Sequence, residues 1–241
     1  AIFSMQFIKR TILVTGASSG IGQACAIALL KQGHEVIGVS RNCAQFIVSH
    51  PEFTAYQIDL SDLDSLPAKL KQLSQQFPHI DSLICAAGKG QFNHLEEFSI
   101  SQIQELMNLN FTSICLLAKH FLPSLKQKSL SDLIFIGSEA ALKGSRKGSI
   151  YCASKFAIRG FSQALRDECA KSNVRVSLIN PGMVKTEFFD QLNFEPGNDK
   201  NQHLLAEDIA DAATYIINAR SGIIIDEINL NPANKVIQFK K

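Results

Sequence analysis

Short runs of aliphatic residues alternate with helix-length segments along most of this chain of 241 residues. The runs at 10–15, 35–40, 54–58, 81–86, 132–137, 174–179 and 223–230 are predicted as strands. Most of these runs lack the polar alternation of a strand with one face in water, so we expect both faces to be covered. Strands of this kind, separated by helices, predict an α/β fold with an open, doubly wound sheet of about seven mostly parallel strands and helices on both faces.

Helices are predicted at 20–32, 62–77, 99–128, 149–171 and 206–218. The third is expected to break near Asn110 into two helices, and Pro123 to kink or end the second of them. No linker or internal repeat divides the chain, so residues 1–241 are expected to form one domain. The irregular segment 182–203 contains Phe188, Phe189 and Phe194 and is expected to be a substrate loop or lid. A poorly ordered surface loop is the alternative.

Composition and charge argue against several classes of protein. The formal net charge of +2 gives no electrostatic case for nucleic-acid binding. No apolar run approaches the roughly 18–20 residues of a membrane span, and the six histidines show no metal-ligand spacing, so neither a membrane nor a metal is expected. The six cysteines are scattered without a CxxC pair and the first residues lack a signal-peptide pattern, which predicts a cytoplasmic protein. Residues 1–4 are interpreted as a remnant of expression before a native start at Met5.

A glycine-rich turn lies between the first predicted strand and the first predicted helix, with the sequence Thr15-Gly16-Ala17-Ser18-Ser19-Gly20-Ile21-Gly22. Free amides and the dipole of the helix face a phosphate in such a place, which predicts a Rossmann-like dinucleotide site. Gly16 permits the tight turn, Gly20 the approach of the pyrophosphate, and Gly22 close packing of the helix. Ser18 and Ser19 could add hydroxyl donors. Residues 16–20 also fit the nucleophile elbow of a serine hydrolase with Ser18 as nucleophile, but almost no chain precedes them to supply the oxyanion donor.

The end of the second predicted strand bears on which dinucleotide binds. Enzymes that use NAD place an acid there to hold the ribose 2′-hydroxyl. This chain has Ser40 and Arg41 instead, and a guanidinium beside a small hydroxyl suits a 2′-phosphate. We therefore predict NADP(H) in preference to NAD(H), the alternative being that Arg41 is a solvated surface residue.

Tyr151 and Lys155 lie four residues apart and so share one face of a predicted helix. An ammonium near a phenol stabilises the phenolate, so we expect a lowered Tyr151 pKa suited to acid–base work. Ser138 follows the fifth predicted strand, at the sheet edge where open α/β folds bind ligands. Ser138 and Tyr151 can therefore converge on one carbonyl oxygen. Taken alone, a Tyr-x-x-x-Lys pair is most often a half-buried Tyr beside a solvated Lys.

These motifs together resemble the short-chain dehydrogenase/reductase family over nearly the whole chain. The resemblance rests on the glycine motif at 15–22, Asp59-Leu60 after the third strand, Asn110, Ser138, Tyr151, Lys155, Pro181-Gly182 and Thr186. It implies an adenine contact at Asp59 and Leu60 and a nicotinamide contact around Val184 and Thr186. It also implies a cofactor-binding stretch at Ala86, Ala87 and Gly88. The family usually has Asn-Asn-Ala-Gly where this chain has Cys85-Ala86-Ala87-Gly88. The loss of two amides is expected to affect local rigidity more than the chemistry.

The resemblance implies a role for each of four residues. Tyr151 would be the general acid in reduction and the general base in oxidation, and Ser138 would hydrogen-bond the substrate carbonyl. Lys155 would bind the nicotinamide ribose and lower the Tyr151 pKa, and Asn110 would position a water in a proton relay. The family also implies a homodimer or homotetramer formed through the helices around 110–121 and 149–170.

The sequence therefore predicts an NADP(H)-dependent oxidoreductase that interconverts a carbonyl and an alcohol on a small-molecule substrate. A non-catalytic NADP(H)-binding sensor on the same fold is the alternative, and a hydrolase using Ser18 is a weaker one. Substrate specificity is expected to lie in segments 89–97, 139–149 and 182–203. Lys143, Arg146 and Lys147 would attract an anionic substrate, unless they only form a solvated loop.

Overall fold

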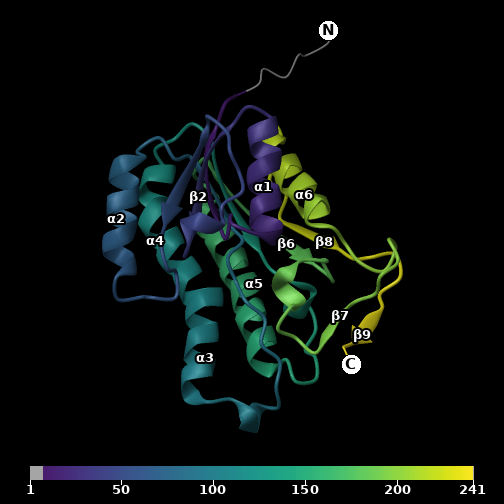
Figure 1. Ribbon diagram of the computed structural model, residues 1–241. Helices are drawn as coiled ribbons and strands as arrows, with labels where there is room; N and C mark the ends of the chain where they lie inside the picture. The colour runs from purple at the N-terminus through teal and green to yellow at the C-terminus, as the bar shows by residue number, and fades with distance from the viewer. Residues whose placement is uncertain (1–7, 241) are drawn as a thin grey trace.

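The computed structural model describes residues 8–240 as a parallel sheet between two layers of helices (Figure 1). The sheet has the order β3-β2-β1-β4-β5-β6-β8, and each neighbouring pair is parallel. Its strands are β1 (Thr11–Thr15), β2 (Glu35–Ser40), β3 (Phe53–Gln57), β4 (Ser82–Cys85), β5 (Ser131–Ile136), β6 (Val174–Pro181) and β8 (Glu227–Leu230). The strand order reverses between β1 and β4, so the predicted doubly wound sheet is confirmed. The interpretation of residues 1–4 and Met5 falls outside the described residues.

Two apolar cores lie on opposite faces of the sheet. Helices α2 (Leu66–Gln76), α4 (Ser113–Leu125) and α5 (Ser149–Cys169) cover one face, and α1 (Gly20–Lys31) and α6 (Ala206–Asn218) cover the other (Figure 1). Alternate residues of β1 point to alternate faces, with Leu13 in the first core and Ile12 and Val14 in the second. All three side chains are fully buried, which explains why the strand shows no polar alternation.

Two predicted helices differ from those observed. The segment 62–77 is helical only from Leu66, because the Asp62 carboxylate accepts hydrogen bonds from the amide and hydroxyl of Ser65 and holds a turn ahead of the helix. The segment 99–128 divides into two α-helices around Asn110, as predicted, but a π-helical turn joins them in place of a break. Its first part, α3 (Ile100–Met107), continues through a π-helical turn (Asn108–Thr112) into α4, which ends shortly after Pro123.

The segment 182–203 is organised by the end of the chain. A short strand within it, β7 (Phe194–Pro196), pairs antiparallel with β9 (Ile237–Phe239), and neither strand was predicted. The Lys240 amide also donates to the carbonyl of Asn193 at 2.9 Å. The segment 182–203 is therefore hydrogen-bonded along part of its length, and residues 234–240 near the C-terminus supply several of these bonds.

Within residues 8–240, none of the helices has the length and apolar character needed to cross a bilayer.

Candidate active site

The carboxyl ends of β1, β2, β4, β5 and β6 open onto one cavity of about 1040 Å³. Its lining runs from the glycine-rich turn, past the ends of β4 and β5, to the segment 182–203 and the β9 strand. This is the edge at which doubly wound sheets bind ligands, beside the reversal of strand order.

The glycine-rich turn is shaped as a phosphate-binding loop. Gly16 and Gly20 have positive φ angles of 69° and 50°, which residues other than glycine rarely adopt. A Cβ on Gly22 would lie 2.3 Å from the Gly16 carbonyl oxygen, so only glycine lets α1 start this close to the turn. The N-cap residue Ser19 makes no side-chain capping bond and the first turn of α1 has no acidic residue. The amides at the start of α1 therefore face the cavity with a partial positive charge.

Ser18 and the end of β2 meet beside this turn. The Ser18 and Ser40 hydroxyls lie 2.8 Å apart, and the exposed Arg41 follows on the rim of the cavity. The hydroxyl pair thus lies where the second strand ends, directly before Arg41 in the chain. Ser18 pairs with another serine rather than with a histidine, which removes the support for a hydrolase.

The stretch after β4 keeps its hydrogen bonds despite lacking the family's two amide side chains. The Thr15 hydroxyl accepts from the amides of Ala86 and Ala87, both at 3.1 Å. A Cβ on Gly16 would lie 3.0 Å from the Ala87 backbone, so the two chain segments are packed closely. Thr15 therefore accepts hydrogen bonds from this stretch, and the expected effect on local rigidity stays a prediction. The role of Thr15 was missed, since the sequence shows it only as the first letter of the glycine motif.

Asn110 lies on the π-helical turn and is fully buried. Its side chain accepts from the Lys89 amide at 3.0 Å and donates to the Lys89 carbonyl at 2.9 Å, with a further donation to the Ser154 hydroxyl at 3.3 Å. A Cβ on Gly88 would lie 3.3 Å from the Asn110 oxygen and 3.8 Å from the Lys155 nitrogen. Asn110 does not line the cavity; it fixes the segment that passes beside Lys155.

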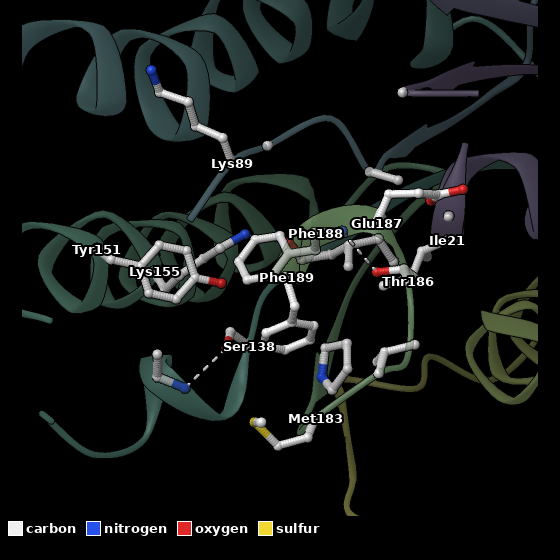
Figure 2. A pocket seen from close by; sticks show the side chains of 18 of the residues that line it. Ile21, Lys89, Ser138, Tyr151, Lys155, Met183, Thr186, Glu187, Phe188 and Phe189 are labelled. Carbon is white, nitrogen blue, oxygen red and sulfur yellow. Dashed lines mark hydrogen bonds between the residues drawn. The ribbon is translucent and has the colours of Figure 1, made fainter. Parts of the chain in front are cut away.

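Ser138, Tyr151 and Lys155 meet in the wall of the cavity (Figure 2). Ser138 follows β5, and its amide donates to the side chain of the buried Asn180 on β6 at 3.3 Å. Tyr151 and Lys155 lie on the first turns of α5 with 6% and 7% of their surface exposed. The Lys155 ammonium donates to the Ile136 carbonyl at 3.2 Å and lies 5.8 Å from the centre of the Tyr151 ring.

Burial dominates the electrostatics of Tyr151 and Lys155. It raises the pKa of Tyr151 to about 12, although the Ser138 hydroxyl lowers that pKa through a hydrogen bond. Burial also lowers the pKa of Lys155 to about 8. The expected lowering of the Tyr151 pKa is therefore wrong in this structure, because desolvation of the phenolate outweighs stabilising contacts. Tyr151 is held as a proton donor at neutral pH.

The other predicted contacts fall into two groups. All of the predicted cofactor residues except Asp59 line the cavity. They are Gly16, Ser18, Ser19, Gly20, Ile21, Ser40, Arg41, Leu60, Ala86, Ala87, Gly88, Tyr151, Lys155, Pro181, Gly182, Val184 and Thr186. Asp59 is exposed, and its carboxylate accepts from the amide and hydroxyl of Ser61. Its neighbour Leu60 is buried and lines the cavity, and the adenine contact at Asp59 stays a prediction.

Several lining residues were not singled out by the sequence. Phe92 lies in the segment 89–97, for which only a general role in specificity was expected. Lys235, Ile237 and Phe239 reach the cavity through the pairing of β9 with β7, and no local pattern indicates that pairing. Among residues 8–240, no group of three or more His, Cys, Asp or Glu side chains is arranged to hold a metal ion.

A doubly wound sheet, a glycine-rich turn ahead of its first helix and a Ser–Tyr–Lys set in one cavity wall are typical of the class of Rossmann-like oxidoreductases. The family model for short chain dehydrogenases matches residues 10–196, and the chain belongs to that family. The family resemblance predicted from the sequence motifs is thereby confirmed.

Similar proteins come from bacteria, a yeast and an archaeon. A probable short-chain type dehydrogenase/reductase, VdlC, of Helicobacter pylori is 32% identical, covering 94% of this chain and 82% of its own. An NADP-dependent 3-hydroxy acid dehydrogenase of Schizosaccharomyces pombe is 28% identical, covering 94% of this chain and 93% of its own. The alcohol dehydrogenase of Thermococcus sibiricus, solved with 5-hydroxy-NADP, superposes with a TM-score of 0.85 at 24% identity, over 96% of this chain and all of that one. That superposition supports the fold.

Proposed function

We propose that this protein is an NADP(H)-dependent oxidoreductase that interconverts a carbonyl and an alcohol on a small molecule, with Tyr151 as acid and base. The observation that carries this proposal is the meeting of Ser138, Tyr151 and Lys155 in the wall of the cavity that begins at the phosphate-binding turn. The yeast relative named as an NADP-dependent 3-hydroxy acid dehydrogenase agrees with this chemistry. A Buchnera aphidicola relative, 30% identical over 91% of this chain and 94% of its own, is named as a 3-oxoacyl-[acyl-carrier-protein] reductase.

Each residue has a role set by its position. Nicotinamide, when bound, supplies the hydride that adds to the carbonyl carbon. Tyr151 donates its proton to the carbonyl oxygen, and the Ser138 hydroxyl holds that oxygen in place. Lys155 binds the ribose hydroxyls of the cofactor, and its charge limits the cost of forming the phenolate. Asn110 acts as a positioning residue, since it holds the Lys89 backbone, and a water beside it would carry the replacement proton.

Removal of the Tyr151 hydroxyl tests the proposed chemistry. Tyr151→Phe keeps the ring but has no proton to give, so kcat for carbonyl reduction should fall by about 10²- to 10⁴-fold. The dissociation constant for NADPH should stay within about twofold of the wild-type value, because the phenol lies away from the phosphate-binding turn. Normal turnover in Tyr151→Phe contradicts the role. A wild-type protein that binds NADPH but oxidises it with no aldehyde, ketone or keto acid is instead a sensor.

The preference for NADP(H) has a separate test at Arg41. Arg41→Ala removes the only full positive charge that the sequence offers beside Ser40, so the dissociation constant for NADPH should rise by about tenfold or more. That for NADH, which has no 2′-phosphate, should barely change. Arg220→Ala, at another exposed arginine, is the matched control for loss of surface charge. Equal affinity of the wild-type protein for both cofactors would refute the preference.

A further inference from the structure

Five aromatic side chains, the phenol of Tyr151 among them, form a closed cycle of ring contacts. Successive ring centres lie 5.0 Å apart for Phe92 and Tyr151, 6.0 Å for Tyr151 and Phe188, and 5.1 Å for Phe188 and Phe189. The cycle closes at 5.8 Å between Phe189 and Phe194 and 5.1 Å between Phe194 and Phe92. We call these five residues the aromatic cluster. Each pair is tilted or edge-to-face, which is the favourable arrangement for two aromatic rings.

The members of the aromatic cluster come from three distant parts of the chain. Tyr151 is on α5, Phe92 follows β4, and Phe188, Phe189 and Phe194 lie in the segment 182–203. Lys240 holds this segment in place through a hydrogen bond, which its ammonium donates to the Phe189 carbonyl. Figure 2 shows Tyr151, Phe188 and Phe189 gathered on one side of the pocket.

Phe188 lines the cavity next to Tyr151. A Cβ on Gly90 would lie 2.3 Å from the tip of the Phe188 ring, so this ring rests directly on the Gly90 backbone beside Tyr151. A carbonyl compound that reaches the Tyr151 hydroxyl has to take the place of part of this ring-to-ring contact. A flat apolar group on the substrate replaces the ring contact that it displaces with an equivalent contact of its own. A charged group loses its hydration among the aromatic rings and gains no such contact.

Lys155, on the helix that carries Tyr151, and the exposed Glu187 are charged groups that lie beside the aromatic cluster, and several other charged groups of the cavity are paired or solvated. Lys89 forms an ion pair with Glu105 at 2.7 Å and points away from the labelled rings in Figure 2. Glu139 is paired with Lys235 at 2.6 Å. Lys143, Arg146 and Lys147 line the cavity from an exposed loop, so their charges are solvated at its mouth.

We propose that the aromatic cluster makes the protein select carbonyl compounds whose C=O carries a flat apolar group, such as an aryl ketone or aldehyde. This inference rests on the proposed function, because the cluster is defined by its contact with Tyr151. In the reaction, hydride from NADPH adds to the carbonyl carbon and the Tyr151 proton to its oxygen. The products are a secondary or primary arylalkyl alcohol and NADP⁺.

Three ketones separate flatness from charge. 4-Methylacetophenone and 4-acetylbenzoate share a ring and a ketone but differ in a methyl or carboxylate group, and cyclohexyl methyl ketone has an apolar ring that is not flat. We expect kcat/KM for 4-methylacetophenone to exceed that for cyclohexyl methyl ketone by about threefold or more, and that for 4-acetylbenzoate by about tenfold. Equal or better use of 4-acetylbenzoate overturns the proposal and favours the basic loop as the specificity element.

Two substitutions attribute the preference to the rings. Phe92→Leu and Phe194→Leu remove an aromatic face but leave an apolar side chain. They should lower kcat/KM for 4-methylacetophenone by about three- to tenfold and change that for cyclohexyl methyl ketone by less than about twofold. Phe77→Leu, which breaks the aromatic pair with Tyr56 away from the cavity, should leave both unchanged. An equal loss on both ketones in the cluster variants contradicts selection by the rings.

A binding measurement separates this inference from the proposed function. Tyr151→Phe retains every ring of the aromatic cluster, so the three ketones can be titrated calorimetrically into that variant with NADPH present. The same order of affinities is expected. If the wild-type protein oxidises NADPH with no aldehyde, ketone or keto acid, the proposed function fails and the order of affinities alone decides the inference. If turnover depends on Tyr151 but shows no preference for the aryl ketone, the aromatic-cluster inference is wrong and the proposed function stands.

Discussion

At the scale of single residues, Lys155 is where burial and charge oppose each other most directly. Only 7% of its surface is exposed, and burial lowers its pKa from 10.5 to about 8. Between these two values the unfolded chain holds a proton that the folded protein has released, so raising the pH favours folding. Below pH 8 both states are protonated, and the folded state carries the full cost of a buried ammonium.

A Lys155→Met variant exposes this cost. At pH 7 its free energy of unfolding should exceed that of the wild-type protein by roughly 3 kcal/mol, since each pKa unit corresponds to about 1.4 kcal/mol. The difference should shrink to about 1 kcal/mol by pH 10, where Tyr151 of the folded protein is still protonated. Urea unfolding of both proteins at several pH values measures it, and the other buried groups largely cancel. A difference that stays constant from pH 7 to 10 contradicts the lowered pKa.

At the scale of elements, the junction between β1 and α1 is the least tolerant of added atoms. A Cβ on Gly22 would lie 2.3 Å from the Gly16 carbonyl oxygen and 2.9 Å from that of Thr15, and backbone cannot rotate away. Gly22→Ala should therefore destabilise the protein by about 1–3 kcal/mol and weaken NADPH binding. Gly144→Ala, in the exposed loop before α5, meets no atom within 4 Å and should stabilise the protein by up to about 1 kcal/mol. Thermal unfolding compares the two; equal effects would argue against crowding at the turn.

The elements that the sequence predicted well are those specified by neighbouring residues. The aliphatic runs of β1, β2 and β6 predict buried strands. The glycines and serines that lie close together at 15–22 predict the turn. The start of α2 was missed because one carboxylate, Asp62, competes with the helix for the Ser65 amide. The strands β7 and β9 were missed because each depends on a distant partner. The aromatic cluster was missed for the same reason, since its members converge only in three dimensions.

At the scale of the whole molecule, helix α5 presents distinct residues on its inner and outer sides. Its inner side carries Tyr151, Lys155 and the buried Ile158. Its outer side presents Phe156, which is 44% exposed, and Gly160, around which no atom lies within 4 Å of an added Cβ. Small and apolar residues on an outer helix face allow close contact with a second helix. We propose that two copies of the chain associate through this face and so hold α5 from outside.

Light scattering decides whether this association occurs. The chain has a mass of 26.5 kDa, and we expect the wild-type protein to scatter as a dimer or tetramer. Phe156→Glu places a charge that would be buried in the contact, so the scattering mass should fall, as should the melting temperature. Ile100→Glu, at an apolar residue that is 77% exposed on α3, is the control and should leave the mass unchanged. A wild-type protein that scatters as a single chain would mean that α5 is stabilised by its inner contacts alone.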